Sequence, residues 1–315
     1  MADDPALAPE PRDAVAPELQ EAILDWYAAR ARTLPFRGTT DPYAILVSEA
    51  MAQQTQAARA GEAWTGFMAR FPTVEALAAA LLADVLRAWQ GLGYNRRAVN
   101  LWRAAGRIVS EFGGEVPADL AALESLPGVG PYTARAVGAI AFGMPVGAVD
   151  TNVRRVLGRI VAGDARALGP SELQRAADAA VPAGRAGEWT HALMDIGAMI
   201  CRPRRPDCVT CPARAWCRYA GEAGAAERTG RAAGAVAAAA REAHAPFHAT
   251  SRWLRGRILD RLREESNGDW VTLDAAIGGH GMGAVSVAVQ ALAKDGLLEL
   301  DAGSTGPIRA RLPII

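Results

Sequence analysis

Four cysteines crowded into one short segment constrain this chain more than any other feature of its sequence. They are Cys201, Cys208, Cys211 and Cys217, and the 315 residues contain no others. Four thiolates so close together can surround one compact inorganic centre. The first residues are acidic and rich in Pro and Ala, unlike a secretion signal, so we expect a cytoplasmic protein. In that compartment, closely spaced cysteines more often bind a metal or a cluster than form disulfides.

Two inorganic centres are compatible with this cysteine group. Four cysteines suit tetrahedral zinc, but zinc ribbons usually pair two Cys-x2-Cys hairpins. Here six, two and five residues separate the cysteines, which leaves one short pair. This graded spacing favours a [4Fe–4S] cluster over zinc. The longest interval contains Arg202, Arg204 and Arg205, which predicts a positive loop suited to phosphate contact.

A second motif is the segment LPGVGPYT, from Leu126 to Thr133. A helical pattern ends before it, and another begins near Pro131, where proline is favoured in the first turn. Gly128 and Gly130 permit positive φ angles and can expose successive backbone N–H groups beside a helix N-terminus. Such an arrangement can bind an anion such as a DNA phosphate. Tight helical hairpins with glycines are common, so the motif is only moderately specific.

Two carboxylates far apart in the sequence form the third feature. Glu49 lies in SEAMAQQTQ, and Asp150 lies in GAVDTNVRR just before a helical pattern. Taken alone, Asp150 is a helix N-cap and Glu49 a solvated helical residue. Taken together, they could cleave an N-glycosidic bond. One acid would protonate the leaving base, and one carboxylate would face the positive charge that develops on the sugar.

The organisation of the chain indicates two domains. Residues 1–16 are expected to be a disordered tail, and residues 17–219 are an all-α region. Helical spacing of apolar residues marks the segments 19–31, 75–89, 97–112, 133–143 and 152–161. Residues 220–247 are a linker rich in Ala and Gly. Residues 248–315 then indicate a helix at 252–265, a short strand followed by the start of a second helix within 270–277, a third helix at 284–296 and two short strands in 297–313. This is the outline of a winged-helix domain.

The bulk charge says little about partners. Lys and Arg together number 34, and Asp and Glu also number 34. This balance argues mildly against nucleic acid, although basic residues can gather on one face. No apolar run reaches the length of about 18 residues that a membrane helix needs, so no membrane contact is expected. The only lysine is Lys294, and all other cations are arginines.

These segments together resemble the helix-hairpin-helix glycosylase superfamily and, within it, the MutY-type adenine DNA glycosylases of the iron–sulfur subgroup. The likeness extends from about Leu24 to Cys217 and includes LDWY, VSEAMAQQT, GLGYNRRAVNL, LPGVGPYTARAV, VDTNVRRVLGR and MDIGAMIC. It implies a mainly α, two-lobed fold with the active site in the cleft between the lobes and the [4Fe–4S] loop at 201–217. One lobe would hold the hairpin, and the other would combine the start of the chain with the cluster region. A small α+β winged-helix-like domain would follow.

The resemblance implies a base-excision repair enzyme that hydrolyses the N-glycosidic bond of adenine mispaired with 8-oxoguanine or guanine. Its partner would be double-stranded DNA, and the protein would be a nucleoid-associated monomer. Glu49 would protonate adenine at N7 and help to activate water, and Asp150 would stabilise or attack the sugar. Tyr132 would lie beside that centre, and Asn152 would support the carboxylates.

The resemblance also implies a set of DNA-contacting residues. Gln54 and Leu92 match residues that enter the duplex near the partner base, and Tyr94 lies on the same intruding loop. The remaining predicted DNA or substrate contacts are Arg37, Thr55, Gly128, Gly130, His191, Arg202, Arg204 and Arg205. The predicted cluster ligands are Cys201, Cys208, Cys211 and Cys217.

Two relatives within the superfamily are alternatives. Endonuclease III has Lys where this chain has Tyr132, and that amine forms a Schiff base with the abasic sugar. Because the chain has no lysine before Lys294, a monofunctional hydrolase is expected. A thymine-mismatch glycosylase also has Tyr at this position but lacks the acid that is Glu49 here. The presence of Glu49 favours a purine substrate, because N7 of a purine can accept a proton. A glycosylase for another purine lesion remains an alternative. An iron–sulfur winged-helix transcription regulator is disfavoured, because Glu49 and Asp150 would have no function in it.

Three departures from the family pattern affect base recognition. Phe36 replaces the usual tryptophan after LP, which keeps an aromatic wall. His191 stands where the family has Glu or Gln near the adenine edge. No NUDIX-like C-terminal domain, which reads 8-oxoguanine in many members, is evident in the sequence. Selectivity for 8-oxoguanine over guanine is therefore less firmly expected than adenine excision.

Overall fold

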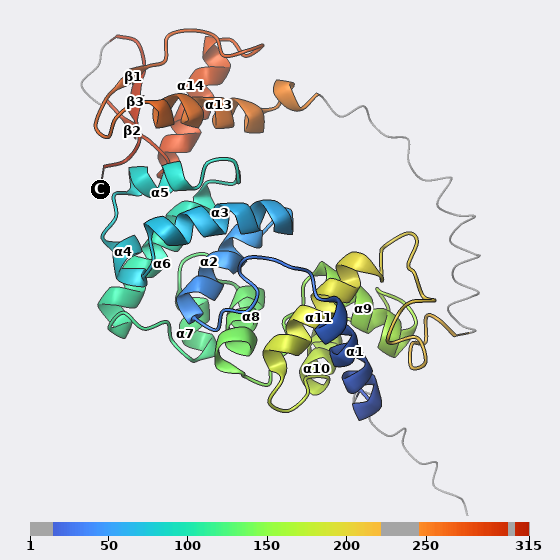
Figure 1. Ribbon diagram of the computed structural model, residues 1–315. Coiled ribbons are helices and arrows are strands. Elements are labelled where there is room, and N and C mark those ends of the chain that lie inside the picture. Colours follow the sequence, from blue (N-terminus) through green and yellow to red (C-terminus); the bar gives the residue numbers. More distant parts are fainter. Residues whose placement is uncertain (1–14, 222–245, 302–305, 315) are drawn as a thin grey trace, which may run out of the picture. The chain divides into compact units, whose positions relative to one another are not determined.

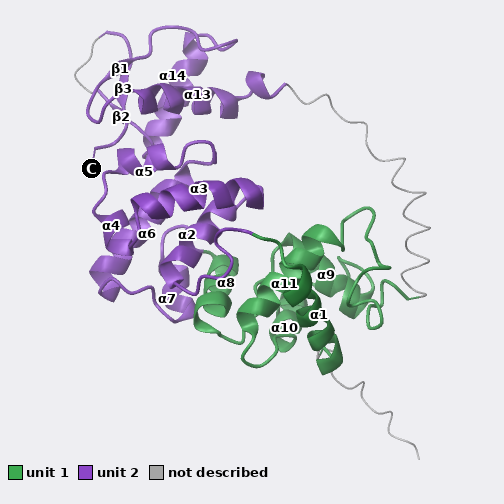
Figure 2. Ribbon diagram, in the orientation of Figure 1, with its two compact units in different colours: residues 1–33, 130–239 green, residues 34–129, 240–315 purple. Residues whose placement is uncertain are grey.

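The computed structural model describes residues 15–221, 246–301 and 306–314 (Figure 1). Residues 1–14 of the predicted tail and 222–245 of the predicted linker lie outside the described residues. The chain divides into two compact units (Figure 2). The first unit comprises residues 1–33 and 130–239, and the second comprises residues 34–129 and 240–315. The first unit therefore joins the start of the chain to the four-cysteine segment.

The described residues of the first unit form five helices. They are α1 (Pro17–Arg30), α8 (Pro131–Phe142), α9 (Thr151–Ala162), α10 (Pro170–Ala179) and α11 (Ala186–Met199). Helix α11 packs against α1, α8 and α9, and its indole Trp189 is fully buried in the core of this unit. Proline stands in the first turn of α1, α8 and α10, where its fixed φ suits the helix and its missing N–H is not needed.

An ion pair with a buried carboxylate joins the two sequence segments of the first unit. Asp195 on α11 is wholly buried and accepts from Nε and the backbone N–H of Arg32 over 2.8 and 2.9 Å. Arg32 Nη2 lies 2.7 Å from Oδ1 of the same carboxylate. Because both carboxylate oxygens receive donors, the buried charge is compensated, and the segment after α1 is fixed to α11.

The second unit begins with six helices. They are α2 (Pro42–Ala52), α3 (Ala57–Arg70), α4 (Val74–Ala78), α5 (Leu82–Ala88), α6 (Arg96–Phe112) and α7 (Leu120–Ser125). Helix α6 packs against α2, α4 and α5. The rings of Phe67 and Trp89 meet edge to face, with their centroids 6.0 Å apart, and both side chains are buried. This aromatic contact belongs to the core of the second unit.

The helices expected at 19–31, 97–112, 133–143 and 152–161 are confirmed as α1, α6, α8 and α9. The single helix expected at 75–89 is wrong, because the chain breaks between α4 and α5. At the break, the carbonyl of Ala80 accepts a hydrogen bond from the indole Nε1 of Trp102 over 3.0 Å. A side chain of α6 thus satisfies a carbonyl that a continuous helix would have satisfied itself.

The C-terminal part of the second unit contains a 3₁₀ turn (Phe247–Ala249), α13 (Ser251–Glu264), β1 (Val271–Thr272), α14 (Met282–Lys294), β2 (Glu299–Leu300) and β3 (Arg309–Arg311). The strands form an antiparallel sheet in the order β1-β3-β2. Val271 pairs with Ala310, and Leu300 also pairs with Ala310 from the other side. The two strands expected in 297–313 are therefore confirmed as β2 and β3, and the short strand expected within 270–277 is confirmed as β1.

The helix expected to start within 270–277 is wrong. The chain forms β1 and then an isolated bridge between Ile277 and His280 instead. Gly278 has a φ of +58°, and a Cβ there would lie 2.6 Å from the ring of Trp253. A left-handed glycine pressed against an indole is compatible with a tight turn but not with a continuing helix.

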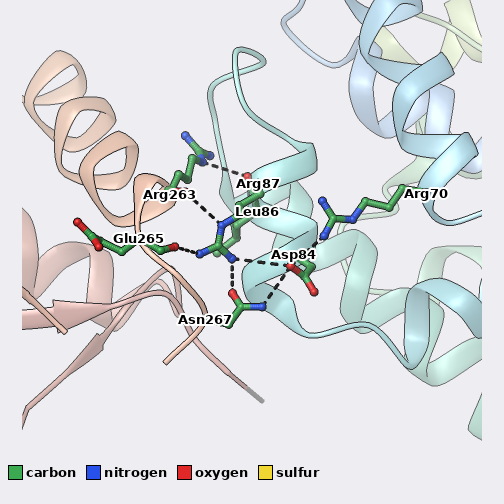
Figure 3. A network of polar contacts seen from close by, with 7 residues as sticks. All are labelled: Arg70, Asp84, Leu86, Arg87, Arg263, Glu265 and Asn267. Atoms are coloured by element: carbon green, nitrogen blue, oxygen red, sulfur yellow. Dashed lines mark hydrogen bonds and ion pairs between the residues drawn. The ribbon is translucent and has the colours of Figure 1, made fainter. Parts of the chain in front are cut away.

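Two arginines join this C-terminal domain to α5 (Figure 3). Arg87 of α5 donates to the backbone carbonyls of Arg263 and Glu265 and to the side chain of Asn267. In return, Arg263 Nε donates to the carbonyl of Leu86 over 3.1 Å. At the start of α5, the N–H of Ala83 donates to the carbonyl of Pro313 over 2.9 Å. The domain is therefore packed on the helices of its own unit.

No helix in the described part of the chain has the length and apolar character needed to cross a membrane.

Candidate functional site

Asp150 is the N-cap of α9, and both of its carboxylate oxygens have donors. Oδ1 accepts from the N–H of Val153 over 2.6 Å, and Oδ2 accepts from Nδ2 of Asn152 over 3.0 Å. Its backbone is extended, with φ −91° and ψ −173°, as is usual for a capping residue. Asp150 therefore caps α9, and the two hydrogen bonds fix the orientation of its carboxylate. Each oxygen keeps a further lone pair that can accept a hydrogen bond.

Arginine side chains of α9 connect this carboxylate to the cysteine loop. Arg155 donates to Oδ1 of Asn152 over 2.8 Å, to the carbonyl of Gly197 over 2.7 Å and to the carbonyl of Cys201 over 2.6 Å. Burial lowers the pKa of Arg155. Gly197 leaves room for this arrangement, because a Cβ there would lie 2.5 Å from Cβ of Asn152. The end of α11 and the start of α9 are therefore held together next to Asp150.

The loop 201–217 follows α11 directly. Arg159 of α9 donates to Sγ of Cys201 over 3.3 Å and to the carbonyls of Arg202 and Pro203 over 2.9 and 3.0 Å. Its guanidinium also lies 4.4 Å from the ring centroid of Tyr219, just after the last cysteine. One buried arginine thus ties down both ends of the loop.

The four cysteines are all half-buried and unbridged. The pKa of Cys211 is raised to about 12, chiefly by burial and also by the neighbouring sulfurs of Cys201, Cys217 and Cys208. Burial also raises the pKa of Cys217. Among the described residues, no three or more His, Cys, Asp or Glu side chains are close enough to hold a single metal ion.

The donor set nevertheless fits an iron–sulfur cluster. Cys201, Cys211 and Cys217 pack against the apolar core of the first unit, and Cys211 is close enough to the other three cysteines to interact with them electrostatically. Such thiols suit thiolate ligation in partly dry surroundings. The exposed arginines of the loop, Arg202, Arg204 and Arg205, form no ion pair within the described residues. Their exposure agrees with the expected positive loop.

The two glycines of the LPGVGPYT segment differ in the sign of their φ angle. Gly128 has a φ of +82°, and a Cβ there would lie 2.7 Å from Cβ of Asn100 on α6. Gly128 therefore uses the positive φ that the sequence permits, whereas Gly130 has a φ of −103° and is the N-cap of α8. A Cβ at Gly130 would meet no atom within 4 Å, and the residue is half-buried. Tyr132 is the second residue of α8 and is half-buried.

Glu49 lies in the last turn of α2 and is half-buried. The loop after α2 contains Gln54, whose φ is +55°. The side chain of Gln54 is exposed, whereas Thr55 is half-buried and accepts from Arg97 over 3.1 Å. A non-glycine residue with positive φ is uncommon and costs free energy, so neighbouring contacts must hold it in place.

The loop after α5 contains the other predicted DNA-entering residues, and they differ in exposure. Tyr94 also has a positive φ, +45°, and its side chain is 42% exposed. Leu92 is only 6% exposed, so it would have to leave the core of the second unit to enter a duplex. Among the described residues, Gln54 and Tyr94 are the only non-glycines with positive φ.

Arg97 holds these two loops together, and we did not anticipate it from the sequence. Its Nη1 donates to the carbonyls of Ala50 and Met51 over 2.9 and 3.0 Å, and also to that of Gln53. Its Nη2 donates to the carbonyls of Leu92 and Gly93, each over 3.1 Å. Burial lowers the pKa of Arg97 to about 10, so the guanidinium stays charged at neutral pH.

The remaining predicted residues occupy packed positions. The ring of His191 on α11 lies 6.3 Å from that of Tyr27 on α1. The ring of Phe36 meets that of Trp64 edge to face at 6.3 Å, so the substituted aromatic position is part of an aromatic pair. Arg37 is half-buried in the turn after Phe36, where its N–H donates to the carbonyl of Leu34 over 2.9 Å.

The chain is similar to known proteins of one family. Residues 47–182 match the model for the HhH-GPD superfamily base excision DNA repair protein. The adenine DNA glycosylase of Mycobacterium tuberculosis is 42% identical over 268 residues, which cover 82% of this chain and 83% of the relative. Among solved structures, a thermostable thymine-DNA glycosylase is 32% identical with a TM-score of 0.60, over 64% of this chain and 94% of that one.

A trapped endonuclease III–DNA covalent intermediate is 25% identical with a TM-score of 0.56, over 67% of this chain and 96% of that one. The structural likeness thus includes a thymine-DNA glycosylase and endonuclease III, while the high identity over most of both chains is to an adenine DNA glycosylase. By that identity, the protein belongs to the adenine DNA glycosylase family, within the HhH-GPD superfamily of base excision DNA repair proteins.

Proposed function

We propose that this DNA glycosylase is monofunctional and hydrolyses the N-glycosidic bond of adenine mispaired with 8-oxoguanine or guanine in double-stranded DNA. The observation that carries the proposal is the carboxylate of Asp150, fixed by Val153 and Asn152 at the start of α9. Family membership supports adenine as the base, because the relative that is 42% identical is an adenine DNA glycosylase.

The chemistry requires an acid and a negative charge. Glu49 protonates adenine at N7, which turns the base into a better leaving group, and then helps to activate water. The sugar becomes oxocarbenium-like as the base departs, and the ionised Asp150 stabilises that positive charge or attacks the sugar. Asn152 keeps one carboxylate oxygen from rotating, because its amide donates to Oδ2.

Tyr132 supports hydrolysis without strand cleavage. A lyase needs an amine to form a Schiff base with the abasic sugar, and a phenol cannot form one. Lys294, the only lysine, is in the C-terminal domain at the end of α14. The protein therefore releases the base and leaves an abasic site.

The cofactor of the proposal is a [4Fe–4S] cluster ligated by Cys201, Cys208, Cys211 and Cys217. When bound, such a cluster cross-links the loop through four iron–thiolate bonds. The loop then presents Arg202, Arg204 and Arg205 to DNA phosphates, and the backbone N–H groups near Gly128 and Gly130 bind a further phosphate.

Recognition of the mispair would come from residues that enter or line the duplex. Gln54 and Tyr94 are exposed and have strained backbones, which suits residues that displace bases. Leu92 joins them if the loop releases it, and Thr55, Arg37 and His191 complete the proposed contact set. The C-terminal domain is winged-helix-like without the middle helix, and the protein acts as a monomer.

The test is base release under single-turnover conditions from duplexes containing adenine opposite 8-oxoguanine, guanine or cytosine. We expect adenine release opposite the first two and little opposite cytosine, with no strand cleavage before alkali. Release of hypoxanthine or another purine in preference to adenine would favour the glycosylase for a different purine lesion. Thymine release from a guanine mispair with no adenine release would contradict the proposal.

A further inference from the structure

The loop between α5 and α6, residues 91–95, has an unusual backbone. Gly91, Gly93 and Tyr94 all have positive φ angles, of +86°, +67° and +45°. Glycine adopts this region without steric cost, but an aromatic residue does not. A strained tyrosine persists only where its surroundings fix it, and such residues concentrate at functional sites.

Arg97, in the first turn of α6, fixes the loop that precedes this helix. Arg97 Nη2 donates to the carbonyls of Leu92 and Gly93, and its guanidinium lies 5.7 Å from the ring centroid of Tyr94. The same guanidinium lies 5.4 Å from the ring centroid of Trp89, which is buried. The backbone of the loop is thus anchored on the core, while the tyrosine ring stays partly exposed.

The C-terminal domain fixes the loop from another side. The guanidinium of Arg252, in the first turn of α13, lies 4.2 Å from the ring centroid of Tyr94. In the last turn of the same helix, Arg263 donates to Oδ1 of Asn95 over 2.8 Å. Arg263 is 6% exposed, and burial lowers its pKa. Two arginines of one helix therefore hold two consecutive residues of the loop.

The helix α13 is itself held against α5. The reciprocal contacts of Arg87 and Arg263 (Figure 3) and the Ala83–Pro313 hydrogen bond anchor the domain at two separate points. Asp295, at the end of α14, accepts from Arg255 and lies 3.7 Å from Arg96 of α6. The contacts to the loop thus belong to a continuous polar interface, and they are not one isolated stacking contact.

From these contacts we propose that the C-terminal domain is a brace for the loop 91–95, with Arg252 and Arg263 as positioning residues that present Tyr94 in one orientation. The proposal makes two claims. The first, that the domain fixes the loop, concerns the protein alone, and the second, that the fixed loop acts on DNA, rests on the proposed function. Direct reading of the partner base by the domain is not needed for this role.

The structural part is tested by hydrogen exchange on the DNA-free, full-length protein. The amides of Leu92 and Arg97 report on the loop, because they donate to the carbonyls of Trp89 and Tyr94. Removing a cation–π contact at a partly exposed site raises opening about two- to five-fold, so Arg252→Ala should speed exchange of these amides by that factor. Alanine suits a helix, so α13 should survive the change.

Two comparisons separate the brace from a general loss of stability. Arg261→Ala removes the same charge from an exposed position of α13 that has no polar partner among the described residues, and it should leave the loop amides unchanged. Tyr94→Phe keeps the ring and should exchange like the wild type, whereas Tyr94→Ala should match Arg252→Ala. Loop exchange that is equal in Arg252→Ala and wild type, or that rises equally in Arg261→Ala, would overturn the brace.

The functional part is tested by single-turnover adenine release at subsaturating enzyme. Arg252→Ala should slow release about two- to five-fold, because the competent loop is populated less, and Arg261→Ala should not. Faster loop exchange with unchanged release would overturn the effect of the brace on DNA. A wild type that releases no adenine would contradict the proposed function instead, while the exchange result would still decide the brace.

Discussion

The amide of Asn152 donates to Oδ2 of Asp150, while the other oxygen of the same carboxylate caps α9 by accepting from Val153. The residue that we assign to the sugar is therefore also a structural cap. These two roles can be separated, because Asn caps a helix about as well as Asp does but has no charge.

Asp150→Asn should keep the fold and lose the chemistry. We expect a thermal midpoint within about 2 °C of wild type, since the cap survives. Adenine release should slow by about 10²- to 10³-fold, the cost that is typical of removing one electrostatic contact from a transition state. Calorimetry and single-turnover kinetics on the same preparation check both parts, and an unchanged rate would leave Asp150 only as a cap.

Glu49→Gln should slow adenine release by about 10²- to 10⁴-fold, because an amide cannot donate the proton that general acid catalysis requires. Binding of the mismatched duplex, measured at fixed salt, should stay nearly the same. Glu62→Gln is a matched control, since Glu62 is an exposed residue of the neighbouring helix α3. Release by Glu49→Gln within a few-fold of wild type would remove this acid from the mechanism.

Tyr132→Lys should convert part of the activity from hydrolysis to strand cleavage. The new amine stands at the second position of α8, where the resemblance to endonuclease III places the Schiff-base lysine. Borohydride should trap this variant on DNA, with slower adenine release, and should not trap the wild type. Efficient trapping of the wild type would reveal a nucleophile that the proposal lacks.

The purified protein should contain about four irons per chain and absorb broadly near ~400 nm, as a cluster held by four thiolates does. Cys208→Ser should lower the iron content and weaken DNA binding. The loop that contains Arg202, Arg204 and Arg205 would then lose one of its four attachments. One zinc and no iron by metal analysis would favour the zinc alternative instead.

Asp195→Asn should destabilise the first unit. This carboxylate is wholly buried and receives three donor contacts from Arg32, and breaking a buried pair typically costs about 3–5 kcal/mol. Arg32 keeps 29% of its side chain exposed and can rehydrate, so we expect the lower end of that range. Glu188→Gln, which breaks an exposed pair with Arg185, should change unfolding free energy by less than about 1 kcal/mol in denaturant titrations.

Local patterns in the sequence predicted what depends on neighbouring residues. The periodicity of α6 and α9, the proline at the start of α8 and the cap at Asp150 all act within a few residues, so a single sequence reveals them. The family motifs likewise pointed to the glycosylase family, because the residues that define it lie in short continuous segments.

Distant contacts decided the rest. At the break between α4 and α5 a carbonyl accepts from Trp102 of α6, and the turn at Gly278 packs closely against Trp253 of α13. Arg97 looked like any other arginine, yet its partners lie 42 to 47 residues earlier as well as in its own loop.

The sequence by itself therefore determined the helical class and the family, because these follow from periodicity and from motifs read in order. Only the tertiary structure decided which arginines hold the loops around Gln54 and Tyr94, and that α13 contacts one of these loops. The physical reason is that a buried guanidinium is stabilised by whichever carbonyls and rings the fold brings to it, and no local pattern encodes those partners.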